Sequence, residues 1–174
     1  MKGISVRYSK GFTLIELMIT IVILSILVSI AIPSFQETIR RNTVTATAND
    51  LIASLLFARS EAIKREQNVA IITSDNWASG WEIFIDSNKN NVKNNGEEVL
   101  NSYTLDIANI SIAGNGGVNT AIVYSPSGRI KNTLTSPTTD FLQISNKDLT
   151  RCIRFSLTGR PRVDKLSRDN GGCS

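Results

Sequence analysis

The chain has 174 residues, of which 19 are Lys or Arg, 15 are Asp or Glu, two are Cys and none is His. Without His there is no Ser-His or Cys-His pair for nucleophilic catalysis, and two Cys alone make a poor zinc site. Because no glycine-rich phosphate loop follows an expected strand either, we expect no enzymatic activity, no cofactor and no metal.

The first element is a long apolar segment near the N-terminus. Residues 12–32 contain a single charged side chain, that of Glu16, and a basic flank precedes them. A helix of this length spans about 30 Å, which is the thickness of the hydrocarbon core of a bilayer. A carboxylate within such a span costs about 2.5 to 3.5 kcal/mol on insertion scales, so we expect Glu16 to have a compensating partner.

Three interpretations of this segment are open. A cleaved secretory signal explains the basic flank, but the apolar segment is long and does not end in a small-x-small cleavage site. A plain single-pass anchor leaves Glu16 unexplained. Cleavage between Gly11 and Phe12 would instead create a new amine, and its ammonium group is a natural partner for the Glu16 carboxylate of a neighbouring subunit.

The segment KGFTLIELMITIVILSILVSIAIPSF, residues 10–35, resembles the N-terminus of type IV pilins and pseudopilins. The resemblance implies that residues 1–11 are a leader that prepilin peptidase removes after Gly11, that Phe12 is then methylated, and that Glu16 guides assembly with other pilins. It also implies a single-pass protein of the bacterial inner membrane, with a periplasmic head, that is incorporated into a type IV pilus. Removal of the leader would lower the formal net charge from +4 to +1.

The helix is expected to continue beyond the membrane. Residues 12–33 form its transmembrane half, and Pro33, which removes one backbone donor, should kink it near Ser29 to Pro33. In residues 34–67 apolar side chains recur at spacings of three and four, which predicts an amphipathic half that ends near Glu66 to Asn68. The apolar stripe comprises Ala48, Leu51, Ile52, Leu55, Ala58, Ala62 and Ile63.

Residues 68–174 contain short apolar segments separated by turn residues, a pattern typical of strands. Strands are expected at 69–73, 80–86, 99–105, 119–125, 140–145 and 150–157. One long helix followed by consecutive strands indicates an α+β fold in which the helix packs on a mostly antiparallel sheet. This architecture agrees with the type IV pilin-like fold that the N-terminal resemblance implies.

Cys152 and Cys173 are expected to form a disulfide, because an even pair of Cys in an exported chain usually does so. The alternative is two free thiols. The bond would close a loop of about 20 residues and stabilise the fold by about 3 kcal/mol on the chain-entropy model. It would also hold a C-terminal tail that otherwise frays.

Asp86, Asn88, Asn90 and Glu97 occupy positions 1, 3, 5 and 12 of an EF-hand-like loop. Asn91 stands where such a loop needs its central Gly, and two Lys lower the local negative charge. An Asn-rich connector between strands explains the same residues, since Asn tolerates left-handed backbone. We therefore expect a connector rather than a calcium site.

Five further segments resemble the FimT/GspH group of minor pilins: SEAIKR at 60–65, GWEIFIDSNKN at 80–90, GEEVL at 96–100, SPSGR at 125–129 and RCIRFSLTGRPR at 151–162. The C-terminal TGRPR and the flanking Cys pair resemble FimT, of type IV pili, more than GspH, of type II secretion. The FimT resemblance implies capture of double-stranded DNA during natural transformation. The implied binding motif is Gly-Arg-x-Arg, here Gly159, Arg160, Pro161 and Arg162.

The C-terminal segment has the charge that DNA binding requires. Residues 151–168 carry a net charge of +5, whereas residues 75–106 carry −4. In extended backbone the guanidinium groups of Arg160 and Arg162 point the same way, about 7 Å apart, close to the spacing of successive phosphates. Gly159 lets a backbone approach closely. The expected patch also includes Lys165, Arg168, Arg154 and Arg151.

No aromatic residue follows Arg160, so we expect contacts to phosphates with little sequence preference rather than base stacking. A solvated basic surface would explain the same charges. The alternative functions are therefore structural: a minor pseudopilin of a type II secretion system, or a pilus assembly or tip subunit that does not bind DNA.

Overall fold

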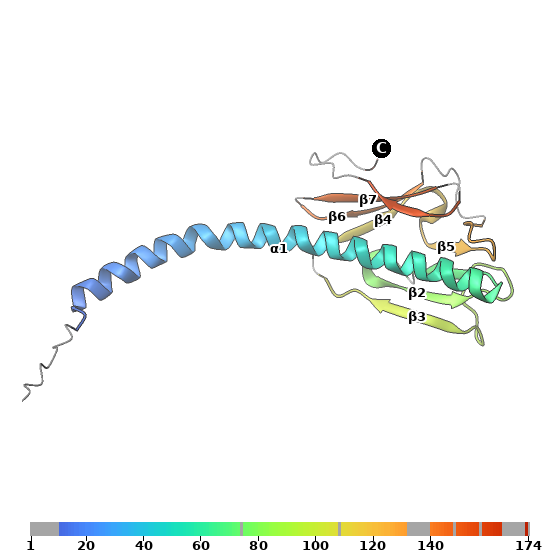
Figure 1. Cartoon of the computed structure of the whole chain (residues 1–174), viewed down its shortest axis with the longest axis horizontal. Coiled ribbons are helices and arrows are strands. Elements are labelled where there is room, and N and C mark those ends of the chain that lie inside the picture. The colour runs from blue at the N-terminus through green and yellow to red at the C-terminus, as the bar shows by residue number, and fades with distance from the viewer. Residues whose placement is uncertain are drawn as a thin grey trace, which may run out of the picture. The chain divides into compact units, whose positions relative to one another are not determined.

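A computed structural model of the chain describes residues 11–73, 75–107, 109–131, 140–147, 149–156, 158–164 and 173. The chain divides into two compact units, residues 1–39 and 40–174, which we describe separately. One helix, α1, contributes to both units, since it begins at Leu14 and ends at Arg65 (Figure 1).

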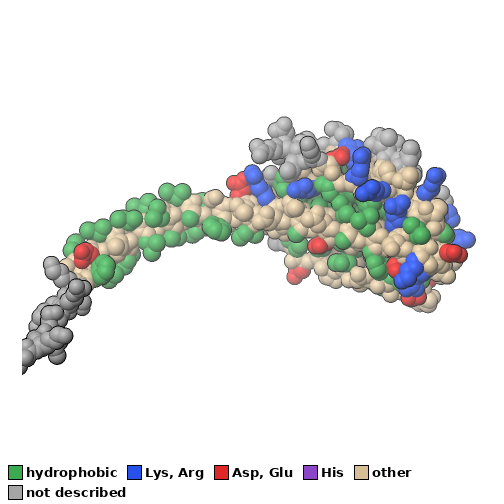
Figure 2. Space-filling model, viewed as in Figure 1, with side chains coloured by type: hydrophobic (Ala, Val, Ile, Leu, Met, Phe, Trp, Pro, Cys, Tyr) green, Lys and Arg blue, Asp and Glu red, His purple; other side chains and the backbone are tan. Residues whose placement is uncertain are grey.

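The N-terminal part of α1 contains the expected membrane-spanning segment. Its apolar side chains are exposed, and it is long and apolar enough to cross a membrane. Figure 2 shows hydrophobic side chains along this part of the helix. Thr13 and Glu16 form a capping box: the Thr13 N–H donates to Glu16 Oε2 at 2.9 Å, and the Glu16 N–H donates to Thr13 Oγ1 at 3.3 Å. The helix is continuous through Pro33, near which the sequence predicts a kink.

The C-terminal part of α1 packs in the head through the predicted apolar stripe. Two expected members are not fully buried: Ile52 is half-buried against the core, and Ile63 is 49% exposed. The exposure of Ile63 follows from helix geometry. Ile63 follows Ala62 directly, and a step of one residue turns a side chain by about 100° around a helix. The remaining expected members are buried, namely Ala48, Leu51, Leu55, Ala58 and Ala62, and so is Val44, which the prediction did not include.

Four strands of the head form a first antiparallel sheet in the order β3-β2-β1-β5. They are β1 (Val69–Ile72), β2 (Gly80–Ile85), β3 (Val99–Thr104) and β5 (Ala121–Tyr124). In the centre of this sheet, Ile71 of β1 stands opposite both Ile83 of β2 and Ile122 of β5. All three side chains are fully buried, which is why these β-branched segments form the middle of the sheet.

A second antiparallel sheet has the order β4-β6-β7-β8, so the strands of the described residues form two sheets rather than the one expected. Its strands are β4 (Ser111–Gly114), β6 (Phe141–Ser145), β7 (Thr150–Phe155) and β8 (Pro161–Val163). The sequence did not predict β4 and β8, because they are short and contain Gly, Ser, Pro and Arg. They form through pairing with β6 and β7, which tertiary context supplies.

The hydrophobic core combines side chains of α1 with side chains of both sheets. Trp77, Trp81 and Tyr124 are among its largest fully buried members. Trp77 lies in a 3-10 helix, η1 (Trp77–Ser79). Its indole N–H donates to the carbonyl oxygen of Asn119 at 2.8 Å. Asn119 directly follows a second 3-10 helix, η2 (Gly116–Val118). The bond satisfies a polar group that would otherwise be costly to bury.

The expected disulfide is present between Cys152 of β7 and Cys173, with their Cα atoms 5.8 Å apart. The Cys173 N–H also donates to Gln143 Oε1 of β6 at 3.2 Å. The disulfide and this hydrogen bond attach Cys173 to β7 and β6 of the second sheet.

Candidate nucleic-acid interface

Two turns of the same sequence pattern build the candidate interface. Residues 125–129, Ser-Pro-Ser-Gly-Arg, follow β5, and residues 156–160, Ser-Leu-Thr-Gly-Arg, follow β7. In each turn the N–H of the first Ser donates to the carbonyl oxygen of the Arg, at 2.8 Å in the first turn and 3.0 Å in the second. The Gly has a positive φ in both, 72° and 79°, which Gly adopts freely. Arg129 and Arg160 therefore occupy equivalent positions.

The two turns pack directly against each other. A Cβ atom on Gly159 would lie 2.8 Å from the carbonyl oxygen of Gly128 and 3.0 Å from the Ile130 nitrogen. The Tyr124 hydroxyl donates to the Gly159 oxygen at 3.1 Å, and Arg59 Nε of α1 donates to the Gly128 oxygen at 2.8 Å. Burial raises the pKa of Tyr124, against a smaller opposite effect of Arg59, so the hydroxyl stays protonated and donates. Both turns are thus fixed to the core.

The hairpin of β7 and β8 directs two guanidinium groups to solvent. Pro161 is buried and stands opposite Phe155, while Arg160 and Arg162 on either side of it are exposed. This alternation agrees with the extended segment expected from the sequence. Arg129 is exposed as well, and we call Arg129, Arg160 and Arg162 the twin-turn surface. Figure 2 shows Lys and Arg side chains over the head.

Arg154 lies beside this surface but is held by other groups. It stands opposite Arg162 in the pairing of β7 with β8, and its Nε donates to Asp164 Oδ2 at 2.6 Å. Its guanidinium carbon also lies 5.6 Å from the centre of the Phe141 ring. Since Asp164 offsets one charge, Arg154 contributes less to a phosphate site than the sequence alone indicates.

Arg151 does not join the twin-turn surface. It precedes the buried Ile153 by two positions in β7, and residues two apart in a strand share one face of the sheet. Its Nη2 donates to Thr45 Oγ1 of α1 at 3.1 Å, so its role in the structure is to join β7 to the helix. Lys165 and Arg168, the other predicted members of the patch, lie outside the described residues.

Arg129 is the member of the surface that sequence reasoning missed. It is 31 positions before Arg160 in the chain and outside the basic C-terminal segment. One signal could have found it: the pattern Ser-x-Ser/Thr-Gly-Arg occurs at both 125–129 and 156–160. The contact between the two turns is a tertiary feature, which the local pattern does not reveal.

Left-handed backbone costs a residue with a Cβ about 1 to 2 kcal/mol. Replacing Gly159 with Ala is expected to lower the free energy of unfolding of the head by more than this, because the new Cβ also meets the Gly128 carbonyl oxygen. Gly96→Ala is the matched control, since Gly96 has a φ of 96° with no other atom near its Cβ position. Urea unfolding of the detergent-solubilised chain measures both. Equal decreases in the free energy of unfolding for Gly159→Ala and Gly96→Ala would show that the contact between the turns is not tight.

The Asn-rich loop after β2 directs its carboxylates to its own backbone. Asp86 accepts the N–H groups of Asn90 at 3.1 Å and Asn91 at 3.2 Å, and Glu97 accepts the N–H of Ser87 at 3.1 Å. Asn91 has a φ of 62°, as the connector interpretation requires. Within the part of the chain that the structure describes, no group of three or more Asp, Glu, Cys or His is arranged to hold a metal ion.

The predicted processing site lies before the first turn of α1. Gly11 and Phe12 are exposed and not helical, which is the kind of backbone that a peptidase can reach. The Glu16 carboxylate accepts both the N–H and the hydroxyl hydrogen of Thr13, each at 2.9 Å. Within one chain, therefore, the carboxylate caps its own helix.

Comparison with known sequences identifies both halves of the chain. Residues 6–32 match the model of the prokaryotic N-terminal methylation motif, and residues 47–159 match that of the type II transport protein GspH. The chain is 26% identical over 164 residues to the pilin-like protein PilA1 of Thermus thermophilus, covering 89% of this chain and 98% of that protein. A fimbrial protein of Pseudomonas aeruginosa is 39% identical over 67 residues, which are 38% of this chain and 44% of that relative, so this match spans less than half of the relative's length.

These matches and the apolar helix identify a membrane-anchored protein of the type IV pilin-like class. The methylation-motif match includes Gly11 and Phe12, the residues of the predicted processing site.

Solved structures agree with this fold. The type IV minor pilin FimU of Pseudomonas aeruginosa is 22% identical, with a TM-score of 0.57 over 74% of this chain and 95% of FimU. The minor pseudopilin EpsH of the Vibrio cholerae type II secretion system is 17% identical, with a TM-score of 0.50 over 69% of this chain and 94% of EpsH. Since the GspH model covers more than half of the chain and follows an N-terminal methylation motif, the chain belongs to the GspH family of type IV pilin-like minor pilins and pseudopilins.

Proposed function

We propose that this minor pilin binds double-stranded DNA through its twin-turn surface during natural transformation. The observation that carries the proposal is the presence of three exposed Arg side chains: Arg129 and Arg160 on two turns that pack against each other, and Arg162 in β8 directly after the second turn. The turns are held by Tyr124 and Arg59, so the guanidinium groups are displayed from backbone that need not become ordered on binding.

The chemistry of this surface suits phosphates rather than bases. Guanidinium is planar, permanently charged and matched to phosphate oxygens, and Arg160 and Arg162 alternate on one side of an extended segment. Pro161 between them is buried, so no apolar side chain at this point is available to wedge between bases. Binding should therefore depend strongly on salt and little on sequence.

The proposal includes the location of the head and the route into a filament. Removal of residues 1–11 exposes the amine of Phe12, which is methylated, and Glu16 of one subunit then pairs with the amine of the next. With the apolar helix in the inner membrane, the head lies on the periplasmic side until the subunit enters a type IV pilus. In the pilus the subunit forms part of the filament and binds DNA, and it catalyses no reaction.

A mobility-shift titration of the detergent-solubilised mature chain with duplex DNA over a series of salt concentrations tests the proposal. Three to six phosphate contacts give a plot of log affinity against log salt with a slope of about −3 to −5. Duplexes of unrelated sequence should bind alike. Absence of binding at low salt, or a strong preference for one duplex, would contradict the proposed function.

The second candidate is a structural minor pseudopilin of a type II secretion system, or an assembly or tip subunit without DNA binding. The match to the GspH model and the fold shared with EpsH favour it. In that case the three Arg form a solvated surface, and the same titration would show no binding.

A further inference from the structure

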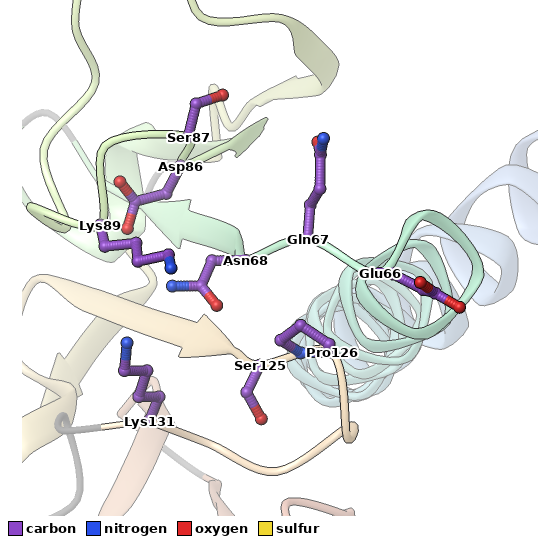
Figure 3. A pocket seen from close by; sticks show the side chains of 9 residues that line it. All are labelled: Glu66, Gln67, Asn68, Asp86, Ser87, Lys89, Ser125, Pro126 and Lys131. Carbon is purple, nitrogen blue, oxygen red and sulfur yellow. The ribbon is translucent and has the colours of Figure 1, made fainter.

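A cavity of about 430 Å³ lies in the head; Ser125 and Pro126 of the first turn are part of its lining, but Arg129, Arg160 and Arg162 are not. Three separate segments line it: the connection from α1 to β1, the loop that follows β2, and the residues that follow β5 (Figure 3). Neither the DNA-binding proposal nor the N-terminal processing site uses the side chains of Asn68, Lys89 and Lys131.

Three nitrogen donors face this cavity. In Figure 3 the side chains of Lys89 and Lys131 extend toward the same space, and Asn68 turns its amide into it between them. Among the described residues, no carboxylate forms an ion pair with either ammonium group. Two like charges that share a cavity repel each other, so an anion placed between them would be stabilised by both.

The amide of Asn68 is the most informative of the three groups. The residue is only 5% exposed, and its Nδ2 is buried without a hydrogen-bond acceptor. A buried donor without an acceptor destabilises the folded state, so native structures rarely contain one without a functional reason. The backbone of the same residue is paired, since its carbonyl oxygen accepts the Asp86 N–H at 2.9 Å. An acceptor in the cavity would satisfy the side chain without moving the backbone.

The two acidic residues of the lining do not fill this role. Asp86 is 1% exposed, and its two carboxylate oxygens accept the backbone N–H groups of Asn90 and Asn91. Figure 3 shows the Glu66 side chain directed away from the cavity. The donors are therefore left to a group that enters from solvent.

We propose that this cavity binds a dianionic phosphate group, held by the ammonium groups of Lys89 and Lys131 and by the amide of Asn68. A phosphate monoester carries a charge of about −1.5 to −2 and three acceptor oxygens, which matches two cations and one further donor. A carboxylate has a single charge and two oxygens and would leave part of the site unmatched. The phosphate is either the free ion or a monoester on a larger molecule.

The test is a titration of the full mature chain, ¹⁵N-labelled at Asn and held in non-ionic detergent, with inorganic phosphate or methyl phosphate at constant ionic strength. The side-chain amide signals of Asn68, identified as the pair that Asn68→Gln removes, should shift and saturate. Saturation by inorganic phosphate indicates the free ion as ligand, and saturation by methyl phosphate alone indicates a monoester.

The double variant Lys89→Gln with Lys131→Gln should weaken this binding about tenfold or more, since it removes both positive charges that attract the phosphate. Lys147→Gln, an exposed Lys on another part of the head, is the matched control and should bind as the parent does. No saturable shift with either probe, or equal binding by the double variant, would overturn the proposal. The probes are free phosphate and methyl phosphate, and Arg129, Arg160 and Arg162 are unchanged in these variants, so failure of this proposal is distinguishable from failure of the DNA-binding proposal.

Discussion

Replacing Arg160 and Arg162 together with Gln is expected to weaken binding to duplexes of unrelated sequence about equally, by about tenfold or more at moderate salt. Both side chains are exposed on one side of the β7–β8 hairpin, and Gln keeps their polarity and most of their length while removing the charge. Because each phosphate contact contributes about 0.9 to the slope of log affinity against log salt, the slope should fall in magnitude by about 2.

Arg65→Gln is a suitable control for this variant. The Arg65 guanidinium forms ion pairs with Glu61 and Glu98. The Arg65→Gln variant therefore removes one positive charge from the head and leaves the twin-turn surface unchanged. The control should bind DNA nearly as tightly as the parent. If the double variant also bound like the parent, the Gly-Arg-x-Arg segment would not be the binding site.

Adding Arg129→Gln to the double variant should reduce the magnitude of the slope of log affinity against log salt by about 1 more.

Replacing Glu16 with Gln is expected to abolish incorporation into filaments while leaving membrane insertion intact. The carboxylate costs about 2.5 to 3.5 kcal/mol in the membrane, so its neutral analogue inserts more readily. Gln can still accept the Thr13 N–H, as capping boxes use either residue. Only the attraction to the amine of a neighbouring Phe12 is removed, and in a medium of low dielectric constant that attraction is large.

Thr13→Ala is the matched control for the Glu16 variant. It removes the hydroxyl that bonds the carboxylate but keeps the charge, so subunits should still assemble. Immunoblots of sheared filaments and of membrane fractions measure the two steps separately. Filaments that contain the Glu16→Gln chain at the level of the parent would show that the charge has no role in assembly.

The sequence predicted the elements with strong periodicity. The helix was expected to end near Glu66 to Asn68 and ends at Arg65, and β1, β2, β3, β6 and β7 begin within one residue of the expected positions. These segments bury side chains with a regular period, so local pattern and tertiary packing agree. The short strands β4 and β8 bury few side chains of their own, and only their neighbours define them.

The candidate site was predictable to a lesser degree. The exposure of Arg160 and Arg162 follows from alternation in an extended segment, which the sequence contains. The placement of Arg151 against Thr45 and the arrival of Arg129 beside Gly159 depend on contacts between distant segments. A net charge summed along a segment counts every cation in it, whereas the fold decides which of them reach the same surface.

The central claim is that this chain is a processed pilin, cut after Gly11 so that the helix begins with a free, methylated Phe12. Intact-mass spectrometry of the chain, purified from a host that contains prepilin peptidase, tests it most directly. The account predicts a mass lower by residues 1–11 and higher by one methyl group, with the modification on the N-terminal fragment. An intact leader, or cleavage downstream of residues 12–32, would contradict it.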